Sequence, residues 1–479
     1  MKILLIKPPL NRNLLAPNHD EPLELEYLGA AVPAHDVRIL DMRIDRRLDR
    51  ALSAFHPDLV GITAYTCDYN VALSALDEVK KFDPRIKTAV GGHHATVLPA
   101  DFARPFVDAI FLGAADDSFR EYVDRSETGR PVEEVANIAF VKDGTLRFTD
   151  KAPATQNLDL LPFPDRRLTL AYRKHYRDRM RSKTGLVMTS RGCPFRCSFC
   201  ACWKIMDGKY LSRSPESIVA EIAAMPEDIE LICFADDNTL HSTRRAWRLI
   251  ELVREKRIRR KFMMYARSDT IVNNPDLMEA LKDIGLEYLL VGIESFNDAE
   301  LTNLNKNLSA RTNLEAVRLL RKIGIRISPH LIVDPEFSRS DFRDLLRGVN
   351  EMELFRPVFT VLTPLPGTEL YEKNIDRLAI RDYDYFDFTH SVLPTKLTRK
   401  EFYRQYARLY GQSYSFKRYF REKLRELAAL GRPSRRRARP HPDRIPFIPL
   451  VILHIASLPG YWKIRRRHKT EPFRALDSM

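Results

Sequence analysis

Short apolar runs alternate with segments of helical periodicity along residues 1–130. The runs predict buried strands at 2–7, 37–40, 59–63, 87–90 and 107–112. Apolar residues at helical spacing predict helices between these strands, at 23–31, 48–55 and 69–82. This rhythm predicts an α/β domain with a doubly wound, Rossmann-like parallel sheet, whose ligands bind beyond the carboxyl ends of the strands.

A second alternation, with longer helices, begins near residue 185. Its predicted strands cover 186–189, 231–235, 262–266, 288–291, 326–333 and 358–362. Polar residues gather where these strands end, which is the catalytic face of α/β barrels. The pattern therefore predicts a partial (β/α)6 barrel after the sheet domain.

The other segments complete the predicted organisation. Residues 160–165 are extended and punctuated by proline, as is typical of a linker. A chain of 479 residues has ample material for two or three domains. We expect, in chain order, a sheet domain, a linker, the barrel, a helical region and a basic tail, at 1–130, 131–180, 181–380, 381–430 and 431–479.

Cys193, Cys197 and Cys200 lie in one loop after the first predicted barrel strand, and cysteine is otherwise scarce. Thiolates suit iron–sulfur clusters or zinc, and three of them can hold a cluster that keeps one metal position open. Structural zinc prefers four protein ligands, and no second Cys-x-x-Cys or His pair follows at the expected distance. A disulfide clip belongs to small secreted chains. The spacing favours a cluster with one unligated iron.

This Cys-x-x-x-Cys-x-x-Cys run, with Phe199 before its last cysteine, resembles the signature of the radical S-adenosylmethionine (SAM) enzymes. The resemblance implies that the three cysteines hold a [4Fe–4S] cluster whose open iron binds SAM. It also implies reductive cleavage of SAM to a 5′-deoxyadenosyl radical, with an external electron donor of the flavodoxin or ferredoxin type.

Residues at matching positions take on the family's SAM contacts as expectations. The expected contacts are Phe199, Asp236, Asp237, Arg267, Ser268, Gly292, Glu294 and Gly367. The alternative for each carboxylate or arginine is a salt bridge at the barrel rim. Cys202 is most simply a small buried residue, although a thiol so close to the cluster could act in catalysis.

The sheet domain in front of this barrel resembles the cobalamin-binding domain of corrinoid-dependent radical SAM enzymes. The Lys7-Pro8-Pro9 turn and the Gly91-Gly92-His93-His94 run carry the likeness, and we expect Gly91, Gly92 and His93 to contact cobalamin. The Asp-x-His-x-x-Gly motif that supplies a cobalt ligand in many corrinoid proteins is absent. A turn-forming glycine and histidine pair that binds nothing is the alternative.

The charge of the chain is concentrated at its end. The net charge is +14, and residues 417–479 hold 17 Lys and Arg against 5 Asp and Glu. These basic residues flank an apolar stretch at 445–462 that prolines interrupt, so a spanning helix is not expected. Clustered arginines beside Tyr461 and Trp462 suit peripheral contact with an anionic membrane. A solvated tail whose apolar part packs on the protein is the alternative, and no nucleic-acid partner is expected.

The first residues, Met1 to Lys7, are apolar over too short a run for a signal peptide, which favours a cytoplasmic enzyme. Residues 381–396 resemble the C-terminal portion of the hopanoid C-3 methylase group, although their aromatic side chains would serve equally as core or as an apolar lining. We therefore expect methylation of an unactivated carbon of a small-molecule or lipid-like substrate. A ring-forming or rearranging radical enzyme and a non-enzymatic iron–sulfur protein are the alternatives.

Overall fold

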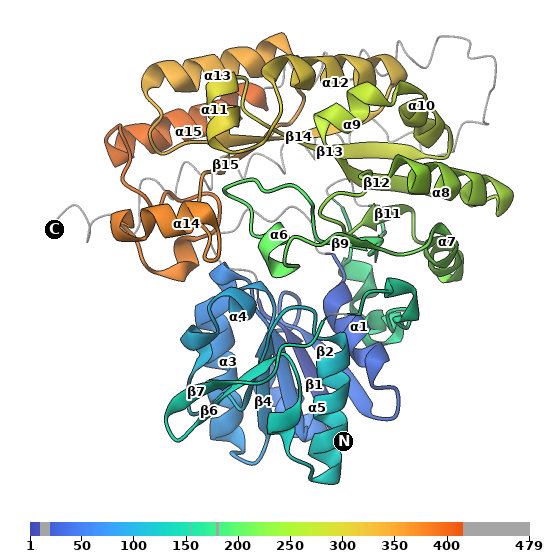
Figure 1. Cartoon of the computed structure of the whole chain (residues 1–479), viewed down its shortest axis with the longest axis vertical. Coiled ribbons are helices and arrows are strands. Elements are labelled where there is room, and N and C mark those ends of the chain that lie inside the picture. The colour runs from blue at the N-terminus through green and yellow to red at the C-terminus, as the bar shows by residue number, and fades with distance from the viewer. Residues whose placement is uncertain (10–19, 154, 179–181, 415–479) are drawn as a thin grey trace.

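The computed structural model describes residues 1–9, 20–153, 155–178 and 182–414. Two domains stand one above the other in Figure 1, with the N-terminal domain in blue below the barrel in green to orange. The expected basic tail at 431–479 and residues 415–430 of the expected helical region lie outside the described residues. Among the described helices, none is long and apolar enough to span a bilayer.

The N-terminal domain is built on a seven-stranded sheet of order β2-β1-β3-β4-β5-β6-β7. Its strands are β1 (Lys2–Lys7), β2 (Asp36–Asp41), β3 (Leu59–Thr63), β4 (Lys87–Gly91), β5 (Ala109–Phe111), β6 (Ile138–Lys142) and β7 (Thr145–Phe148). The first five pair in parallel, which confirms the predicted parallel sheet. Strands β6 and β7 join it in antiparallel fashion.

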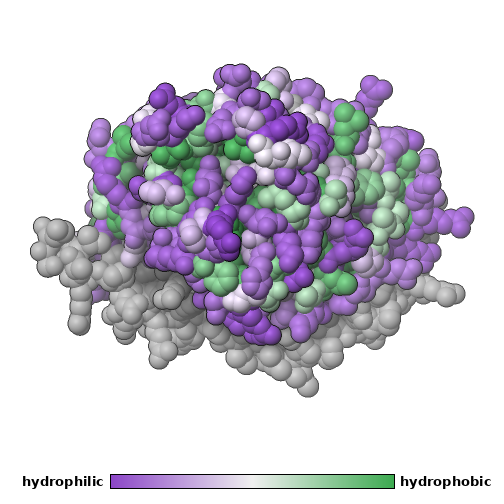
Figure 2. Space-filling model, turned by 90° about the horizontal axis from the view of Figure 1, so that it is seen from below, coloured by the Kyte–Doolittle hydropathy of each residue, from purple (hydrophilic) through white to green (hydrophobic). Residues whose placement is uncertain are grey.

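Helices cover both faces of this sheet and separate two apolar cores. Helices α2 (Leu48–Phe55) and α3 (Tyr69–Phe82) pack on one face. Helices α1 (Leu23–Ala31) and α5 (Asp116–Thr128) pack on the other. The short helix α4 (His93–Val97) follows β4 directly. This arrangement confirms the doubly wound prediction, and Figure 2 shows that hydrophilic side chains cover most of this end of the molecule.

The sheet continues past residue 130, where the sequence pattern placed a linker. Strand β6 buries Ile138 and Ala139 against β5, whereas the side chains of β7 are mostly exposed. An edge strand that buries no face lacks the alternation of apolar and polar residues by which strands are predicted. The hairpin was missed for that reason.

The second domain is a curled six-stranded parallel sheet of order β15-β14-β13-β12-β11-β8, the half-barrel that the sequence predicted. Its strands are β8 (Thr184–Val187), β11 (Leu231–Phe234), β12 (Lys261–Ala266), β13 (Leu286–Glu294), β14 (Arg326–Val333) and β15 (Val358–Val361). The outer helices include α7 (Pro215–Ala224), α8 (Thr243–Glu255), α10 (Pro275–Asp283), α12 (Ala310–Ile323), α13 (Arg339–Glu351) and α15 (Arg399–Ser413). The largest apolar core lies between these helices and the sheet.

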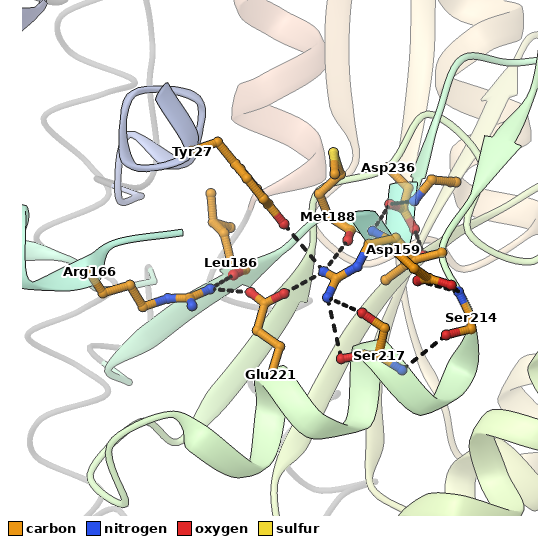
Figure 3. A network of polar contacts seen from close by, with 12 residues as sticks. Tyr27, Asp159, Arg166, Leu186, Met188, Ser214, Ser217, Glu221 and Asp236 are labelled. Atoms are coloured by element: carbon orange, nitrogen blue, oxygen red, sulfur yellow. Dashed lines mark hydrogen bonds and ion pairs between the residues drawn. The ribbon is translucent and has the colours of Figure 1, made fainter. Parts of the chain in front are cut away.

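Buried charges tie the segment between the domains to the barrel, as Figure 3 shows. Arg166 of the 3-10 helix η5 (Arg166–His175) donates to Glu221 of α7 at 2.7 Å and to the Leu186 carbonyl at 2.6 Å. Arg213 donates to the same Glu221 carboxylate and, at 3.0 Å, to the Met188 carbonyl. Each charge here is nearly inaccessible and is paired, which offsets its cost of desolvation.

A segment after the barrel packs back onto the N-terminal domain. The Tyr383 ring of the 3-10 helix η7 (Tyr383–Tyr385) lies 5.2 Å from the Tyr69 ring and 4.7 Å from the His94 ring, measured between centroids. Asn70 donates to Asp382 at 2.9 Å. The aromatic run that the sequence left open as core or lining therefore joins the two domains at this point.

Candidate active site between the domains

A cavity of about 420 Å³ lies between the carboxyl edge of the N-terminal sheet and the cysteine loop of the barrel. This volume is within the range of about 300–1,000 Å³ that small-molecule and cofactor sites occupy. Apolar residues of the N-terminal sheet, among them Leu5 and Phe111, line it together with Arg191, Cys202 and Asp237 of the barrel. Both expected cofactor regions therefore open into one space.

The glycine–histidine run forms part of the cavity wall. Gly91, Gly92 and His93 all line the cavity, as expected, whereas His94 is fully buried and bonded to Thr66 and Asp101. Gly92 has φ of +99°, and a Cβ there would lie 2.8 Å from the Ala64 carbonyl oxygen. Only glycine lets the chain turn this close to the neighbouring loop.

Tyr65 also lines the cavity and is missing from the expected contacts. Its ring stacks on His93 with centroids 4.8 Å apart and an interplanar angle of 23°. The Lys7 ammonium lies 5.2 Å from the centroid of the same ring and pairs with Glu24 at 2.6 Å. The enclosing atoms of the cavity wall lower the pKa of His93 by desolvation, so its imidazole is neutral at physiological pH.

The three cysteines of the motif are free thiols at the carboxyl end of β8, and none of the chain's six cysteines, all of them described, forms a disulfide. Cys197 is buried, and Cys193 and Cys200 are partly exposed. The three thiols lie near enough to interact electrostatically with one another. In the described part of the chain, no three His, Cys, Asp or Glu side chains converge on a single metal ion.

This arrangement fits a cluster better than a mononuclear metal. A cluster spreads its cysteine ligands over separate iron atoms, so the sulfurs need not meet at one point. Burial raises the pKa of Cys193 to about 11, which disfavours a free thiolate. Metal coordination reverses that preference because it deprotonates a thiol outright. The motif cysteines form no disulfide in this structure, and the zinc alternative lacks a fourth ligand in the described residues.

Asp236 and Asp237 follow β11 and hold the start of the cysteine loop. Asp236 accepts from the Thr189 amide at 2.7 Å, the Thr189 hydroxyl at 2.5 Å and the Ser190 amide at 2.8 Å. Both of its carboxylate oxygens are thus engaged within the protein. Asp237 accepts from the Gly192 amide at 3.1 Å and faces the cavity. Of these two aspartates, only Asp237 presents its carboxylate to the cavity.

Cys202 is only partly buried and stands in the cavity wall, so the reading as a buried core residue is wrong. Its thiol lies within hydrogen-bonding distance of Cys200 and Asp237. The hydrogen bond from Cys202 lowers the pKa of Cys200. Cys202 therefore supports a thiolate at the last cysteine of the motif.

The expected contacts at the end of β13, Gly292 and Glu294, lie beside Lys306. Glu294 has φ of +59° and pairs with the buried Lys306 at 2.8 Å. A Cβ on Gly292 would lie 2.2 Å from the Glu294 carboxylate, so the glycine makes room for this pair. Burial acts to lower the pKa of Lys306, but Glu294 and Cys197 raise it overall. Lys306 was missed because a lone lysine in a loop carries no sequence signal.

Arg267 and Ser268 are engaged in contacts within the protein. The Arg267 guanidinium lies 3.7 Å from the centroid of the Phe195 ring and donates to the Lys306 carbonyl at 3.0 Å. Ser268 is fully buried and donates to Asn313 at 2.6 Å. Arg267 therefore lies against the cysteine loop, whereas the Ser268 hydroxyl has no access to a ligand.

The last two expected contacts lie at the rim of the barrel. Phe199 packs against Leu304, Ile332 and Leu362 at the carboxyl ends of the strands. Gly367 has φ of +81°, and a Cβ there would lie 2.8 Å from a Val97 methyl group of the N-terminal domain. Gly367 is thus a point of close approach between the domains.

An ion pair across the domain boundary was also missed. Asp116, the first residue of α5, pairs with Arg191 at 2.5 Å, just before the cysteine loop. Burial acts to raise the pKa of Asp116, but Arg191 lowers it overall, so the carboxylate stays charged. The two residues are far apart in sequence, and no local pattern links them. Both line the cavity, so this pair holds the sheet edge against the loop.

Comparisons with known proteins agree with this two-domain site. The B12 binding domain family matches residues 16–123, and the Radical SAM superfamily matches residues 187–349. The hopanoid C-3 methylase of Methylococcus capsulatus is 28% identical over 80% of this chain and 74% of that protein. The anaerobic magnesium-protoporphyrin IX monomethyl ester cyclase of Rubrivivax gelatinosus is 26% identical over 73% of this chain and 64% of that protein.

A solved structure has a similar fold over most of this chain. The cobalamin-dependent SAM radical enzyme OxsB, with aqua-cobalamin and SAM bound, superposes with a TM-score of 0.69. The match has 16% sequence identity and covers 85% of this chain and 66% of that chain. At this identity the likeness concerns the fold.

The two matched domains imply a [4Fe–4S] cluster, SAM and cobalamin as cofactors, and the residues present fit these groups. The three free thiols suit the cluster, and the cavity along the sheet edge, with Gly91 and Gly92 in its wall, suits a corrinoid. The chain therefore carries a B12 binding domain followed by a Radical SAM domain, and it is similar to cobalamin-dependent radical SAM enzymes.

Proposed function

We propose that this enzyme transfers a methyl group to an unactivated carbon. One observation carries the proposal: the cavity of the N-terminal sheet and the cysteine loop share a wall at Asp237 and Cys202. When bound, the cofactors supply the electron, the 5′-deoxyadenosyl radical and the methyl group. The protein's part is to hold them side by side and to exclude water.

We propose the following roles for the chain's own residues. Cys193, Cys197 and Cys200 hold the cluster. Asp237 accepts from the SAM amino group, for which its cavity-facing carboxylate is suited. The Glu294–Lys306 pair places opposite charges beside Cys197, close to where SAM meets the cluster. The backbones of Asp236, Ser268 and Gly292 remain available for contacts that their side chains do not make.

The glycine–histidine run and the apolar side chains of the cavity wall are proposed to receive the corrinoid. Gly91 and Gly92 let the backbone approach it, and His93 adds a neutral imidazole to the wall. Asp116 and Arg191 keep this wall against the cysteine loop. No side chain is required as a base, because a hydrogen atom and not a proton leaves the substrate carbon.

The experiment that tests this function uses SAM labelled in its methyl group. The anaerobically reconstituted full chain, supplied with cobalamin and an external reductant, is expected to pass the label to a product heavier by one methyl group. A Cys193→Ala, Cys197→Ala, Cys200→Ala variant is expected to bind no iron and to cleave no SAM. Cleavage by that variant at the wild-type rate would contradict the assignment of the cysteines.

Ring formation or rearrangement without methyl transfer is the second candidate. The likeness to the magnesium-protoporphyrin ester cyclase favours it, because that protein's name describes ring closure and the match covers most of this chain. The same labelled SAM separates the two reactions. A product of altered structure that carries no label, formed together with 5′-deoxyadenosine, would establish the second candidate and overturn the first.

The substrate is proposed to be apolar or lipid-like, with peripheral membrane contact through residues 431–479. The basic excess in the tail and the likeness to the hopanoid C-3 methylase support this proposal. The full chain is expected to sediment with vesicles of anionic lipid, and less so at high salt, because exposed charges are screened over about 8 Å at physiological ionic strength. If a chain truncated before residue 432 sediments with the vesicles as much as the full chain does, the proposed membrane contact is contradicted.

Radical SAM enzymes depend on an external electron donor, and we propose one of the flavodoxin or ferredoxin type. The exposed Arg196 and Lys209 near the cysteine motif support an acidic partner. Reduced flavodoxin is expected to replace a chemical reductant in SAM cleavage. Failure of every protein donor tried, while the chemical reductant works, would contradict this proposal.

A further inference from the structure

Tyr65 is the most accessible aromatic side chain in the cavity wall. It is 48% exposed, although aromatic side chains normally bury most of their surface. The exposed surface faces the cavity that lies between the two domains. Neither the glycine–histidine run nor the cysteine motif accounts for a phenol at this position.

The surrounding groups hold this phenol in one orientation. The Tyr65 amide donates to the Asp68 carboxylate at 3.2 Å, and the Asp68 amide donates to the Tyr65 carbonyl at 3.0 Å. The ring itself lies between the Lys7 ammonium and the His93 imidazole. Lys7 is fixed in turn by its ion pair with Glu24. The side chain is therefore preorganised, as a group that meets a ligand should be.

The place of Tyr65 in the sheet is where a ligand is expected. The strand order β2-β1-β3-β4-β5 reverses direction at β1 and β3, and ligands of such sheets bind outside the carboxyl ends at that switch point. Lys7 ends β1, and Tyr65 follows β3 after Ala64. The phenol thus stands over the switch point itself.

The neighbouring histidines are less suited to meet the centre of a corrinoid. His94 is fully buried and bonded to Thr66 and Asp101. His93 lines the cavity but stacks face to face on the Tyr65 ring. The sequence also lacks the Asp-x-His-x-x-Gly motif. Two polar side chains at the carboxyl end of β3 line the cavity: the Thr63 hydroxyl, which lies beside Gly92, and the Tyr65 phenol.

We propose that Tyr65 is the side chain that the N-terminal domain presents to the cobalt of the bound corrinoid, in the place that a histidine takes in other corrinoid proteins. The inference requires only that a corrinoid binds, and it holds whether the reaction ends in methyl transfer or in ring formation. Lys7 acts to lower the pKa of Tyr65, but desolvation by the surrounding protein atoms and the nearby carboxylates raise this pKa overall, so a neutral phenol faces the cavity.

The test is the electron paramagnetic resonance spectrum of cob(II)alamin bound anaerobically to the full chain, because this spectrum reports the axial ligand of cobalt without turnover. The wild-type protein is expected to show no nitrogen splitting. Tyr65→Phe is expected to change the cobalt hyperfine pattern and the visible spectrum of the bound corrinoid. Tyr65→His, prepared with ¹⁵N, is expected to gain a splitting into two from the protein's own nitrogen.

Tyr69→Phe is the matched control, since Tyr69 lies four residues further on but does not line the cavity. Its spectrum is expected to equal that of the wild type. Loss of corrinoid binding in Tyr65→Phe but not in Tyr69→Phe would also support the proposal. Nitrogen splitting in the wild type, or a Tyr65→Phe spectrum that superimposes on it with corrinoid bound, would overturn the proposal. A change on His93→Gln alone would assign the position to His93 instead.

Discussion

Replacement of Gly92 by alanine tests whether the cavity wall depends on one backbone conformation. Gly92 has φ of +99° and ψ of −173°, a region that is essentially restricted to glycine. Holding another residue there costs about 1–3 kcal/mol. The added Cβ would also lie 2.8 Å from the Ala64 carbonyl oxygen and 2.9 Å from the Ala64 nitrogen. These are backbone atoms, so the loop has to move.

The movement has a cost that can be worked out from the hydrogen bonds around the loop. The Ala64 amide donates to the Gly91 carbonyl at 2.9 Å, and the His94 amide donates to the Ala64 carbonyl at 3.1 Å. Loss of one such bond costs about 0.5–1.5 kcal/mol net. Together with the conformational strain, we expect Gly92→Ala to lower the free energy of local opening by about 2–4 kcal/mol.

Hydrogen exchange of the amides in residues 60–96, followed by mass spectrometry, measures this opening directly. A loss of about 2 kcal/mol or more predicts exchange faster by about 30-fold or more at Ala64 and His94. Hydroxocobalamin affinity is expected to fall at least about tenfold, which corresponds to about 1.4 kcal/mol.

Gly91→Ala is the matched control, because a Cβ there makes only an ordinary 3.5 Å contact with Phe111. The control is expected to remain within about 0.5 kcal/mol of the wild type. Equal hydrogen exchange in the Gly92→Ala and Gly91→Ala proteins would refute the reasoning.

Further outcomes follow from buried charges and thiols. Glu26 is fully buried and desolvation raises its pKa to about 8, so its carboxyl destabilises the fold as the pH rises toward 8. Glu26→Gln should therefore flatten the loss of thermal stability between about pH 5 and pH 8. Parallel curves of melting temperature against pH for the wild type and the variant would contradict this. Lys306→Met leaves Glu294 buried without a counter-charge and should cost about 3–5 kcal/mol in urea unfolding, most of it recovered when Glu294→Gln is added. Cys202→Ala should retain the iron content of the wild type, whereas Cys197→Ala should lose it, as measured by iron and sulfide analysis; equal iron in both would contradict the ligand assignment.

Local pattern predicted the regular elements well because each carries its own periodicity. Helix α3 at Tyr69–Phe82, strand β3 at Leu59–Thr63 and strand β14 at Arg326–Val333 have the predicted bounds. Strand β7 was missed because it buries no apolar face. Prediction succeeded where burial imposes a period on the sequence and failed where an edge strand is held by backbone pairing alone.

In the candidate site as well, features carried by the local sequence were predicted, and contacts between distant segments were not. The cysteines were predicted from their spacing, and the carboxylates after β11 were expected from the resemblance to the radical SAM family. The use of both Asp236 oxygens by Thr189 and Ser190 was not predictable, since it depends on how two strands meet. Lys306 and Tyr65 were missed because each enters the site from a loop with no distinguishing pattern.

The relative position of the two domains is what turns these separate features into one site. Asp116 and Arg191 join the first turn of α5 to the start of the cysteine loop. Because Gly367 has no Cβ, Val97 at the end of α4 can pack directly against its backbone. Each contact links a loop at the sheet edge to a strand end of the barrel. Radical chemistry requires reacting groups to be placed within a fraction of an ångström, and these two contacts between the domains restrict the relative motion of the domains. This restriction is a property of the packed interface, and neither domain alone encodes it.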